Sequence, residues 1–290
     1  MTLLAIILGL SIERLMPNLL EYRRFDWLFT YQQWMKNKLS RFSHWNDTLS
    51  FALILLLPII AISFLHYEIY KAGAVLGFAF SVLILAYSLG PRDIYGLKQQ
   101  LKDLPSEDCD KELRTIASQL SANELPGNSE DLFSMVKNKI LLSINTHLLG
   151  VLFWFLILGP MGAIMYRLTL VIHESHSEEE ESNEEYASTA AMLFAIINLL
   201  PAHVTALCFA TTGNFVDAAQ SWQENKVKNL LSNPQCDNML TSVGEGAMNL
   251  DETTICDAKP VVGAILSMAK RSIILWLTVL ALLTMSGWAG

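Results

Sequence analysis

The sequence predicts an all-α fold, a polytopic membrane helical bundle with two proline-interrupted helices and cytoplasmic amphipathic helices. Two observations favour this fold. Hydrophobic residues make up 52% of the 290 residues and charged residues only 17%, which is more apolar than a soluble domain of this size requires. The apolar residues also gather in runs, several of them near the ~20 residues that an α-helix needs to cross a bilayer. These runs lie near residues 3–15, 49–65, 72–89, 140–172, 190–210 and 273–288.

The beginning of the chain combines a short apolar run with a stretch whose composition suits the membrane surface. The run 3–15 ends at Glu13-Arg14, so it either spans the bilayer or enters it only partway. The stretch from Met16 to Trp45 is rich in aromatic and basic residues, as expected of helices that lie at the membrane surface. The next two runs are joined by a short turn and are expected to cross the membrane.

The distribution of basic residues predicts the orientation. Nearly all of the 20 Lys and Arg residues lie between the first two runs, in 91–139 and in 211–271. Because an excess of Lys and Arg marks cytoplasmic connections, we expect all three on that side. We expect 91–139 to form a small helical subdomain, and an amphipathic helix at about 215–231 to cover the cytoplasmic mouth of the bundle. The segment 173–188 carries seven Glu and no Lys or Arg, and is expected to face outward.

Two proline motifs interrupt the apolar runs. The Gly159-Pro160 pair lies inside the fourth run, where proline removes a helical hydrogen bond and glycine relaxes the backbone, so the helix should kink or divide there. Pro201 lies inside the fifth run, between Asn198 and His203. Irregular backbone at membrane depth persists only where protein or a wet cavity surrounds it, so the paired breaks favour a polar cavity in the bundle.

Polar side chains near these breaks are the candidate ligand contacts, because buried polar groups in membrane helices hold helices together or touch a ligand. Arg92 and Asp93 follow the third run, where they either cap a helix and anchor it at the interface, or hold an anion beside exposed backbone N–H groups. The full set of candidates is Arg92, Asp93, Asn145, Thr146, Arg167, Asn198, His203 and Asn214.

Metal and nucleic-acid sites receive little support. His173, His176 and Glu178 place imidazole and carboxylate groups close together in sequence, as a divalent metal would require, but a solvated glutamate loop is the favoured interpretation and no metal site is predicted. The four cysteines form no CxxC pair. The formal net charge of −8 comes mostly from the segment 173–188, and no basic, aromatic-rich face for nucleic acid is indicated.

Several motifs, in order along the chain, resemble one known family. They are Gly90-Pro91-Arg92-Asp93, Asn145-Thr146, Phe153-Trp154, Gly159-Pro160-Met161-Gly162-Ala163, Tyr166-Arg167 and the stretch from Asn198 to Ala206. Over essentially its whole length the chain resembles the AmpE proteins of Gram-negative bacteria. This resemblance implies a multi-pass inner-membrane protein with the segment 173–188 in the periplasm. It also implies a role in β-lactamase induction and the cell-envelope response, and a functional link to the cell-wall amidase AmpD.

The AmpE family is itself similar to the CobD/CbiB synthases, membrane enzymes that join an amine to a corrinoid carboxylate with ATP. In their pattern, acidic residues surround the Asn-Thr element and follow the Tyr-Arg element. Here 140–143, 148–150 and 168–172 carry no carboxylate, although such a ligase needs carboxylates to hold Mg²⁺ and to move a proton. The resemblance therefore implies a retained scaffold whose chemistry is lost or changed.

The first interpretation is a regulatory or sensor protein that binds a small ligand in a polar cavity and requires no cofactor. Two alternatives stay open: a membrane amide ligase or transferase that uses Mg-ATP, and a transporter of cell-wall fragments. Membrane lipid is the expected partner, a homodimer is left open, and nucleic acid is not expected. No catalytic residue is assigned.

Overall fold

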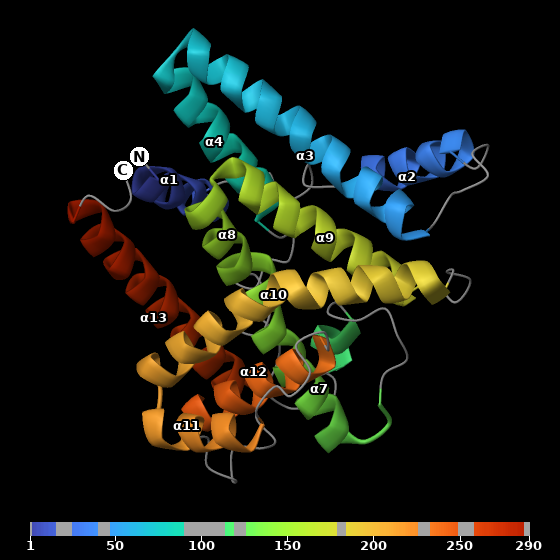
Figure 1. The fold of residues 1–290 in the computed structure, drawn as a ribbon. Helices are drawn as coiled ribbons and strands as arrows, with labels where there is room; N and C mark the ends of the chain where they lie inside the picture. The colour runs from blue at the N-terminus through green and yellow to red at the C-terminus, as the bar shows by residue number, and fades with distance from the viewer. Residues whose placement is uncertain are drawn as a thin grey trace.

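The computed structural model describes residues 2–15, 25–39, 47–89, 114–118, 126–178, 184–225, 233–248 and 258–286. Every regular element in these ranges is helical (Figure 1), so the predicted all-α fold is confirmed for this part of the chain. The helices are α1 (Thr2–Leu15), α2 (Asp26–Leu39), α3 (Asp47–Ala72), α4 (Ala74–Ser88), α7 (Ser129–Ile144), α8 (Gly150–Leu158), α9 (Pro160–Glu178), α10 (Glu184–Thr212), α11 (Phe215–Glu224), α12 (Asn233–Met248) and α13 (Ala258–Met285), and a π-helical turn at Asn145–Leu149 joins α7 to α8.

Most of the predicted apolar runs are helices that could cross a membrane. Four stretches of the described residues are long and apolar enough to do so: Leu53–Ala72, Ser129–Leu158, Ser188–Thr212 and Val261–Leu282. Two shorter apolar helices, Thr2–Ile12 and Ala74–Ser88, correspond to the first and third runs. Most of the last apolar run, 273–288, lies in the second half of α13, which begins at Ala258.

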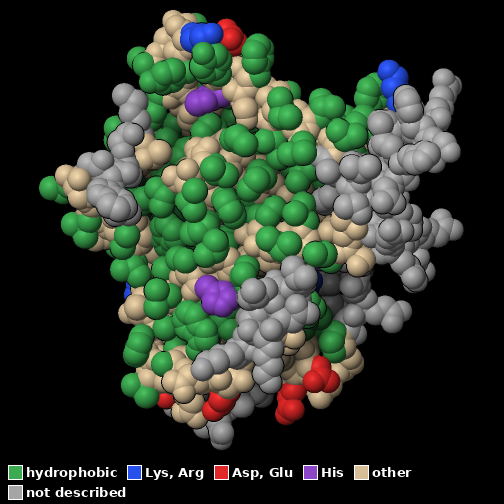
Figure 2. All heavy atoms as spheres, viewed as in Figure 1, with side chains coloured by type: hydrophobic (Ala, Val, Ile, Leu, Met, Phe, Trp, Pro, Cys, Tyr) green, Lys and Arg blue, Asp and Glu red, His purple; other side chains and the backbone are tan. Residues whose placement is uncertain are grey.

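Large apolar side chains cover the outside of the bundle. Ile60 and Phe64 on α3 are 63% and 65% exposed, and Val75 on α4 is 80% exposed. Figure 2 shows one face that is largely hydrophobic, with charged side chains near its upper and lower ends. A continuous apolar surface of this kind is unfavourable in water and favourable against lipid tails, so the chain is a membrane protein.

The chain reverses direction between α8 and α9. Gly159 has a φ of 65°, a left-handed conformation that glycine adopts without steric cost, and Pro160 begins α9. Gly162 has no side chain, so α9 packs directly against the Trp154 carbonyl of α8. Of the two predicted outcomes, a kink or a division, the structure therefore has the division. The apolar segment 140–172 belongs to two packed antiparallel helices.

The second proline motif has a different outcome. α10 runs without a gap through Pro201, so this proline does not break it into two helices as the sequence suggested. The helix bends instead: its first half lies along α9, and its second half turns towards α11 and α12 (Figure 1). Three buried apolar clusters form the core of the described part of the bundle, and α10 contributes at least one residue to each. Examples are Ala190, Phe194 and Ala202, which belong to different clusters. It is therefore the helix at which the parts of the bundle meet.

The residues after α10 tie it to α12 and, through α12, to α7. The Asn214 N–H, two residues beyond α10, donates to the Ala247 carbonyl at 2.8 Å. α12 is joined in turn to the first half of α7 by an ion pair of 2.9 Å between Lys137 and Glu245. Since α8 and α9 are antiparallel, α7 begins on the side of the bundle where α9 ends.

The predicted cytoplasmic segments are only partly described. The amphipathic helix expected at 215–231 is present as α11 and ends at Glu224, while 226–232 lie outside the described residues. Of the predicted subdomain 91–139, the structure describes 114–118 and, from 126 onward, the start of α7.

Candidate functional site

Four polar side chains form a hydrogen-bonded junction where α9, α10 and the π-helical turn meet. Thr205 Oγ1 donates to Asn145 Oδ1 at 2.8 Å, and Asn145 Nδ2 donates to Asn198 Oδ1 at 2.9 Å. The Tyr166 hydroxyl donates to the same Asn198 oxygen, also at 2.9 Å. Each of the four residues is at most 1% exposed. We call this set, Asn145, Tyr166, Asn198 and Thr205, the Asn198 junction.

The π-helical turn determines which side chain faces the junction. Asn145 is its first residue, and π-helical turns of this kind often occur at functional sites. The next residue, Thr146, donates to the Leu142 carbonyl of its own helix at 3.1 Å. Of the adjacent candidates Asn145 and Thr146, only the first therefore belongs to the junction.

Gly150 gives Tyr166 access to the junction. A Cβ atom added to Gly150 would overlap the hydroxyl and the ring of Tyr166, so the missing side chain is what lets the phenol lie against α8. The ring of Tyr166 also lies 6.0 Å from the ring of Phe194 on α10. Close backbone approach at one glycine thus brings a tyrosine from α9 to an asparagine of α10.

Trp154 replaces the hydrogen bond that Pro201 cannot make. Proline has no N–H, so the Ile197 carbonyl, four residues before Pro201, loses its helical donor. The Trp154 Nε1–H of α8 donates to this carbonyl at 3.1 Å. A buried carbonyl without a donor would destabilise the fold, and the indole removes that cost. The helix can therefore continue through the proline, next to the Asn198 junction.

Arg167 lies beside Tyr166 on α9 and is 3% exposed. Its Nη1 donates to His147 Nδ1 at 2.7 Å, since a guanidinium can only donate. His147 Nδ1 therefore carries a lone pair, and the ring proton is on Nε2, which lies 3.7 Å from Glu174 Oε1. The chain of guanidinium, imidazole and carboxylate compensates a positive charge that would be costly inside a membrane protein.

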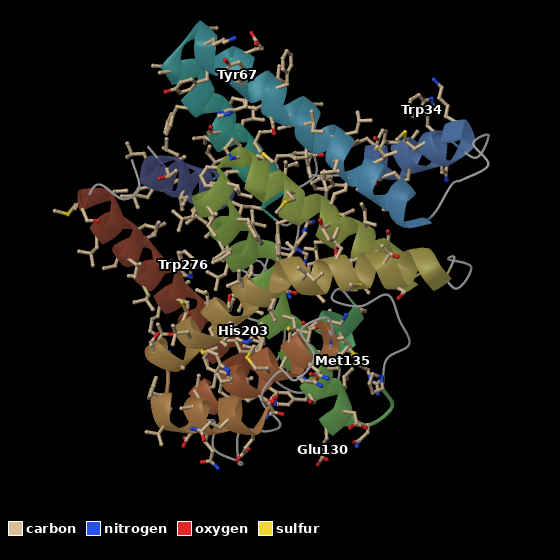
Figure 3. The ribbon with its side chains drawn as sticks, viewed as in Figure 1. Trp34, Tyr67, Glu130, Met135, His203 and Trp276 are labelled. Carbon is tan, nitrogen blue, oxygen red and sulfur yellow. The ribbon has the colours of Figure 1, made fainter. Side chains whose placement is uncertain are left out.

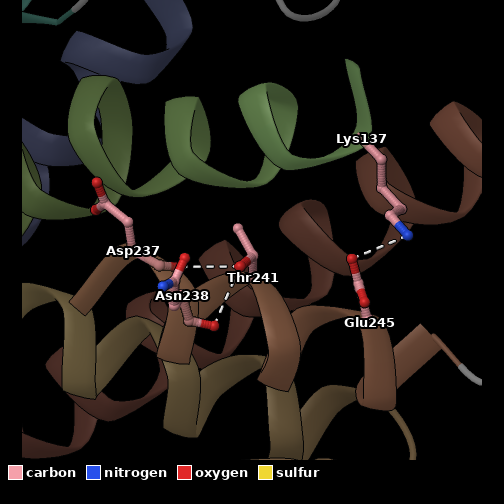
Figure 4. Close-up of polar contacts among 5 residues, drawn as sticks. All are labelled: Lys137, Asp237, Asn238, Thr241 and Glu245. Carbon is pink, nitrogen blue, oxygen red and sulfur yellow. Dashed lines mark hydrogen bonds and ion pairs between the residues drawn. The ribbon is translucent and has the colours of Figure 1, made fainter. Parts of the chain in front are cut away.

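An ion pair joins α12 to α7, and further polar contacts lie within α12 (Figure 4). The Lys137 ammonium and the Glu245 carboxylate form the ion pair across the two helices. The Thr241 hydroxyl lies 2.9 Å from the Asp237 carbonyl and 3.1 Å from the Asn238 carbonyl, and so stays on its own helix. The Asp237 carboxylate points away from Thr241 (Figure 4).

Asp237 brings a second carboxylate near the Asn198 junction. It lies close enough to Tyr166 to act electrostatically on its hydroxyl. α12 is not one of the stretches that could cross a membrane, and burial raises the pKa of Asp237 to about 7, against an opposing effect of Lys139. A carboxyl group from α12 that titrates near neutral pH therefore lies close to the buried junction.

The remaining predicted contacts lie elsewhere. The His203 Nδ1–H donates to the Leu199 carbonyl of its own helix at 2.8 Å, and its ring lies 6.0 Å from that of Trp222 on α11. Asn214 caps α11, because its Oδ1 accepts from the backbone N–H of Val216 at 3.1 Å. Arg92 and Asp93 lie outside the described residues.

Of the weak metal candidates, the structure describes the side chain of His173 alone. The His173 ring stacks on Phe194 with 4.8 Å between ring centroids. The side chains of His176 and Glu178 lie outside the described residues. In the described part of the chain, no three His, Cys, Asp or Glu residues gather as a metal site.

Four contributors were not among the predicted contacts: Tyr166, Glu174, Thr205 and Asp237. Thr205 follows Asn198 by seven residues and Glu174 follows Arg167 by seven, a spacing that places both pairs on one face of a helix and could have identified them. Asp237 comes from a distant connection, and its position depends on how α12 packs. No local pattern in the sequence indicates that packing.

A double-mutant cycle tests whether the Trp154 N–H replaces the hydrogen-bond donor that Pro201 lacks. We expect Trp154→Phe to lower the free energy of unfolding by about 1–2 kcal/mol, because the Ile197 carbonyl loses its donor. In a Pro201→Ala background the new backbone N–H can serve that carbonyl, so the same change should cost about 1 kcal/mol less. Chemical or thermal unfolding of the detergent-solubilised protein measures both. Equal costs in the two backgrounds would contradict the assignment.

The titration of Asp237 predicts a pH dependence of stability. Because its pKa is raised in the fold, the unfolded chain releases this proton at lower pH, and stability should fall as the pH rises from about 4 to about 7. The difference in Tm between the native protein and Asp237→Asn should therefore change over this window and level off above it. The exposed Asp131→Asn is the control. Parallel pH profiles for the native protein and Asp237→Asn would refute the prediction.

Comparisons with known proteins relate the chain to two groups. The family model described as regulatory signalling modulator protein AmpE matches residues 1–289. The chain is also similar to cobalamin biosynthesis protein CobD of Chromobacterium violaceum, 36% identical over 72 residues, which are 25% of this chain and 22% of that protein. A probable CobD of Pyrococcus furiosus is 25% identical over 133 residues, 46% of each chain.

A third relative, the probable CobD of Thermococcus kodakarensis, is 23% identical over 177 residues, 60% of this chain and 59% of that protein. The chain thus spans less than two thirds of the length of the curated relatives it matches. No solved structure matches it significantly. Because the family model extends over almost the whole of this helical membrane protein, the chain belongs to the AmpE family of regulatory signalling modulator proteins.

Proposed function

We propose that this protein is an inner-membrane regulatory or sensor protein that binds a small polar ligand at the Asn198 junction. One observation carries the proposal: Asn198 Nδ2 is buried and has no hydrogen-bond partner in the described part of the chain. An unpaired buried donor costs about 1–3 kcal/mol, which a ligand with an acceptor oxygen or nitrogen would recover. The family description as a signalling modulator supports regulation as the outcome of that binding.

The surroundings of Asn198 support a two-state response. Its junction joins the bent α10 to the π-helical turn, and both features can change geometry with little loss of hydrogen bonding. Ligand binding at Asn198 Nδ2 would favour one arrangement of these helices over another. A link to β-lactamase induction, to the cell-envelope response and to the amidase AmpD follows from the family resemblance and is part of the same proposal.

The orientation in the membrane is a separate proposal. The concentration of Lys and Arg in three connections supports a cytoplasmic location for them. The antiparallel packing of α8 and α9 supports a revised location for the acidic segment 173–188, because α9 ends on the side where α7 begins. We therefore propose that this acidic segment lies on the same side as the basic connections, and that α10 enters the bundle and returns without crossing.

A second candidate function has one observation in its favour. Glu174 and Asp237 supply carboxylates near Tyr166, although the sequence shows none directly beside the Asn-Thr and Tyr-Arg motifs. Mg²⁺ carried by ATP phosphates often needs only one or two protein carboxylates, so these residues fit that modest requirement and Arg167 could hold a phosphate or carboxylate. The similarity to CobD proteins of cobalamin biosynthesis is consistent with an amide ligase or transferase.

Complementation of a deletion strain tests the sensor proposal. Loss of one ligand hydrogen bond of about 1.4 kcal/mol weakens the affinity about tenfold, so Asn198→Ala should fail to restore the β-lactamase response to a β-lactam inducer at ligand levels near the native Kd. Thr146→Val is the matched control, because Thr146 adjoins the junction but bonds only to its own helix. The measurement is β-lactamase activity at equal amounts of membrane protein.

Two results would decide between the candidates. A normal response with Asn198→Ala, in a strain whose deletion phenotype is clear, would contradict the sensor site. Turnover of ATP by the purified protein with an added amine and carboxylic acid, abolished by Arg167→Ala, would favour the ligase. Absence of nucleotide turnover above a detergent-only control would exclude it.

A further inference from the structure

Helix α2 has two faces of different chemistry. The face against the bundle is almost completely buried and comprises Phe25, Leu28, Gln32 and Met35. The opposite face exposes Trp27 by 41% and Trp34 by 51%, and Lys38 is exposed as well. These three residues recur at intervals of seven and four, so they form one stripe along the outside of the helix.

This outer stripe has the chemistry of the membrane surface. Trp34 points away from the bundle (Figure 3), and the Lys38 ammonium lies 4.7 Å from the centre of its ring. Tryptophan prefers the headgroup region, where its ring is partly in apolar surroundings and its N–H is hydrated. A lysine held over such a ring presents its charge at the same depth.

Charge complementarity identifies the occupant. Between Arg23 and Arg41 the sequence carries five basic residues and one acidic residue. α2 itself contributes Lys36 and Lys38 to this excess, and the other three basic residues lie beside it in the sequence. A segment with this excess, which also carries two exposed tryptophans, attracts the negative headgroups of the cytoplasmic leaflet by about 1 kcal/mol per basic residue near the surface. We propose that the outer stripe of α2, namely Trp27, Trp34 and Lys38, binds anionic lipid headgroups.

The buried face of α2 connects this surface to the neighbourhood of the Asn198 junction. The Phe25 ring lies 5.4 Å from the Arg167 guanidinium, in a cation–π contact. The same ring lies 4.8 Å from that of Tyr87, whose hydroxyl accepts a hydrogen bond from Trp27 Nε1 at 3.0 Å. Lipid that holds α2 in place therefore also holds Phe25 on the arginine beside Tyr166.

The chain offers a matched control for the lipid contact. At the other end of α3 the Lys71 ammonium lies 4.2 Å from the centre of the Tyr67 ring, and both side chains are exposed (Figure 3 labels Tyr67). The test compares Trp34→Ala/Lys38→Gln with Tyr67→Ala/Lys71→Gln. Each removes one exposed aromatic ring and one positive charge, the first pair on α2 and the second near the end of α3.

Thermal unfolding in nanodiscs provides the readout. Added phosphatidylglycerol, in place of phosphatidylcholine, should raise the Tm of the native protein and of the Tyr67/Lys71 variant equally. The Trp34/Lys38 variant should need about fivefold more phosphatidylglycerol, or more, to reach half of its rise in Tm. High salt should reduce the rise in Tm of the native protein and of both variants. In the native protein, phosphatidylglycerol should slow hydrogen exchange around Arg167 over the same range of lipid content in which it raises the Tm.

Several outcomes would overturn the proposal. An equal gain in both variants, or the same gain with phosphatidylcholine, would remove α2 as the anionic lipid site. Protection of α2 from labelling in native membranes, but in no nanodisc composition, would identify a protein partner as its occupant. A lipid-dependent Tm without any change of exchange around Arg167 would refute the connection through Phe25. These readouts do not require the ligand proposed for the Asn198 junction.

Discussion

A buried carbonyl oxygen inside a membrane bundle needs hydrogen-bond donors from the protein, and at Asn198 this requirement determines how three helical segments meet. Its oxygen accepts from Asn145 and from Tyr166, so the π-helical turn, α9 and α10 can approach only in a geometry that serves both donors. Thr205 fixes the orientation of the Asn145 amide in turn. The fold and the candidate site therefore depend on the same few contacts.

The path of α10 follows from this junction and from the neighbouring proline. Pro201 leaves the Ile197 carbonyl without its helical donor, and Trp154 supplies one from α8. The bend is thus held from two sides, by an indole before the proline and by the Asn145 contact to Thr205 after it. Because the helix turns here, its two halves reach separate apolar clusters. The proposed orientation, in which α10 returns without crossing the membrane, depends on this bend.

The sequence was sufficient for the class of fold and for part of the site. Apolar runs and polar residues within them predicted the membrane helices, a kink or division at Gly159-Pro160, and Asn145, Arg167 and Asn198 as candidate inward-facing residues. It could not predict that α8 and α9 pack side by side, since this depends on Gly162 against the Trp154 carbonyl. Nor could it predict that Pro201 leaves α10 continuous, because the compensating donor comes from another helix.

Thiol labelling measures most directly whether α10 returns to the side from which it came. In a variant without native cysteines, Ser182→Cys and Asn225→Cys mark the two sides of α10, and Tyr70→Cys marks the exposed turn between α3 and α4. An impermeant maleimide should label residues 182 and 225 in inverted vesicles and residue 70 in spheroplasts. Labelling of 182 and 225 from opposite sides would show that α10 crosses the membrane, and would contradict the account.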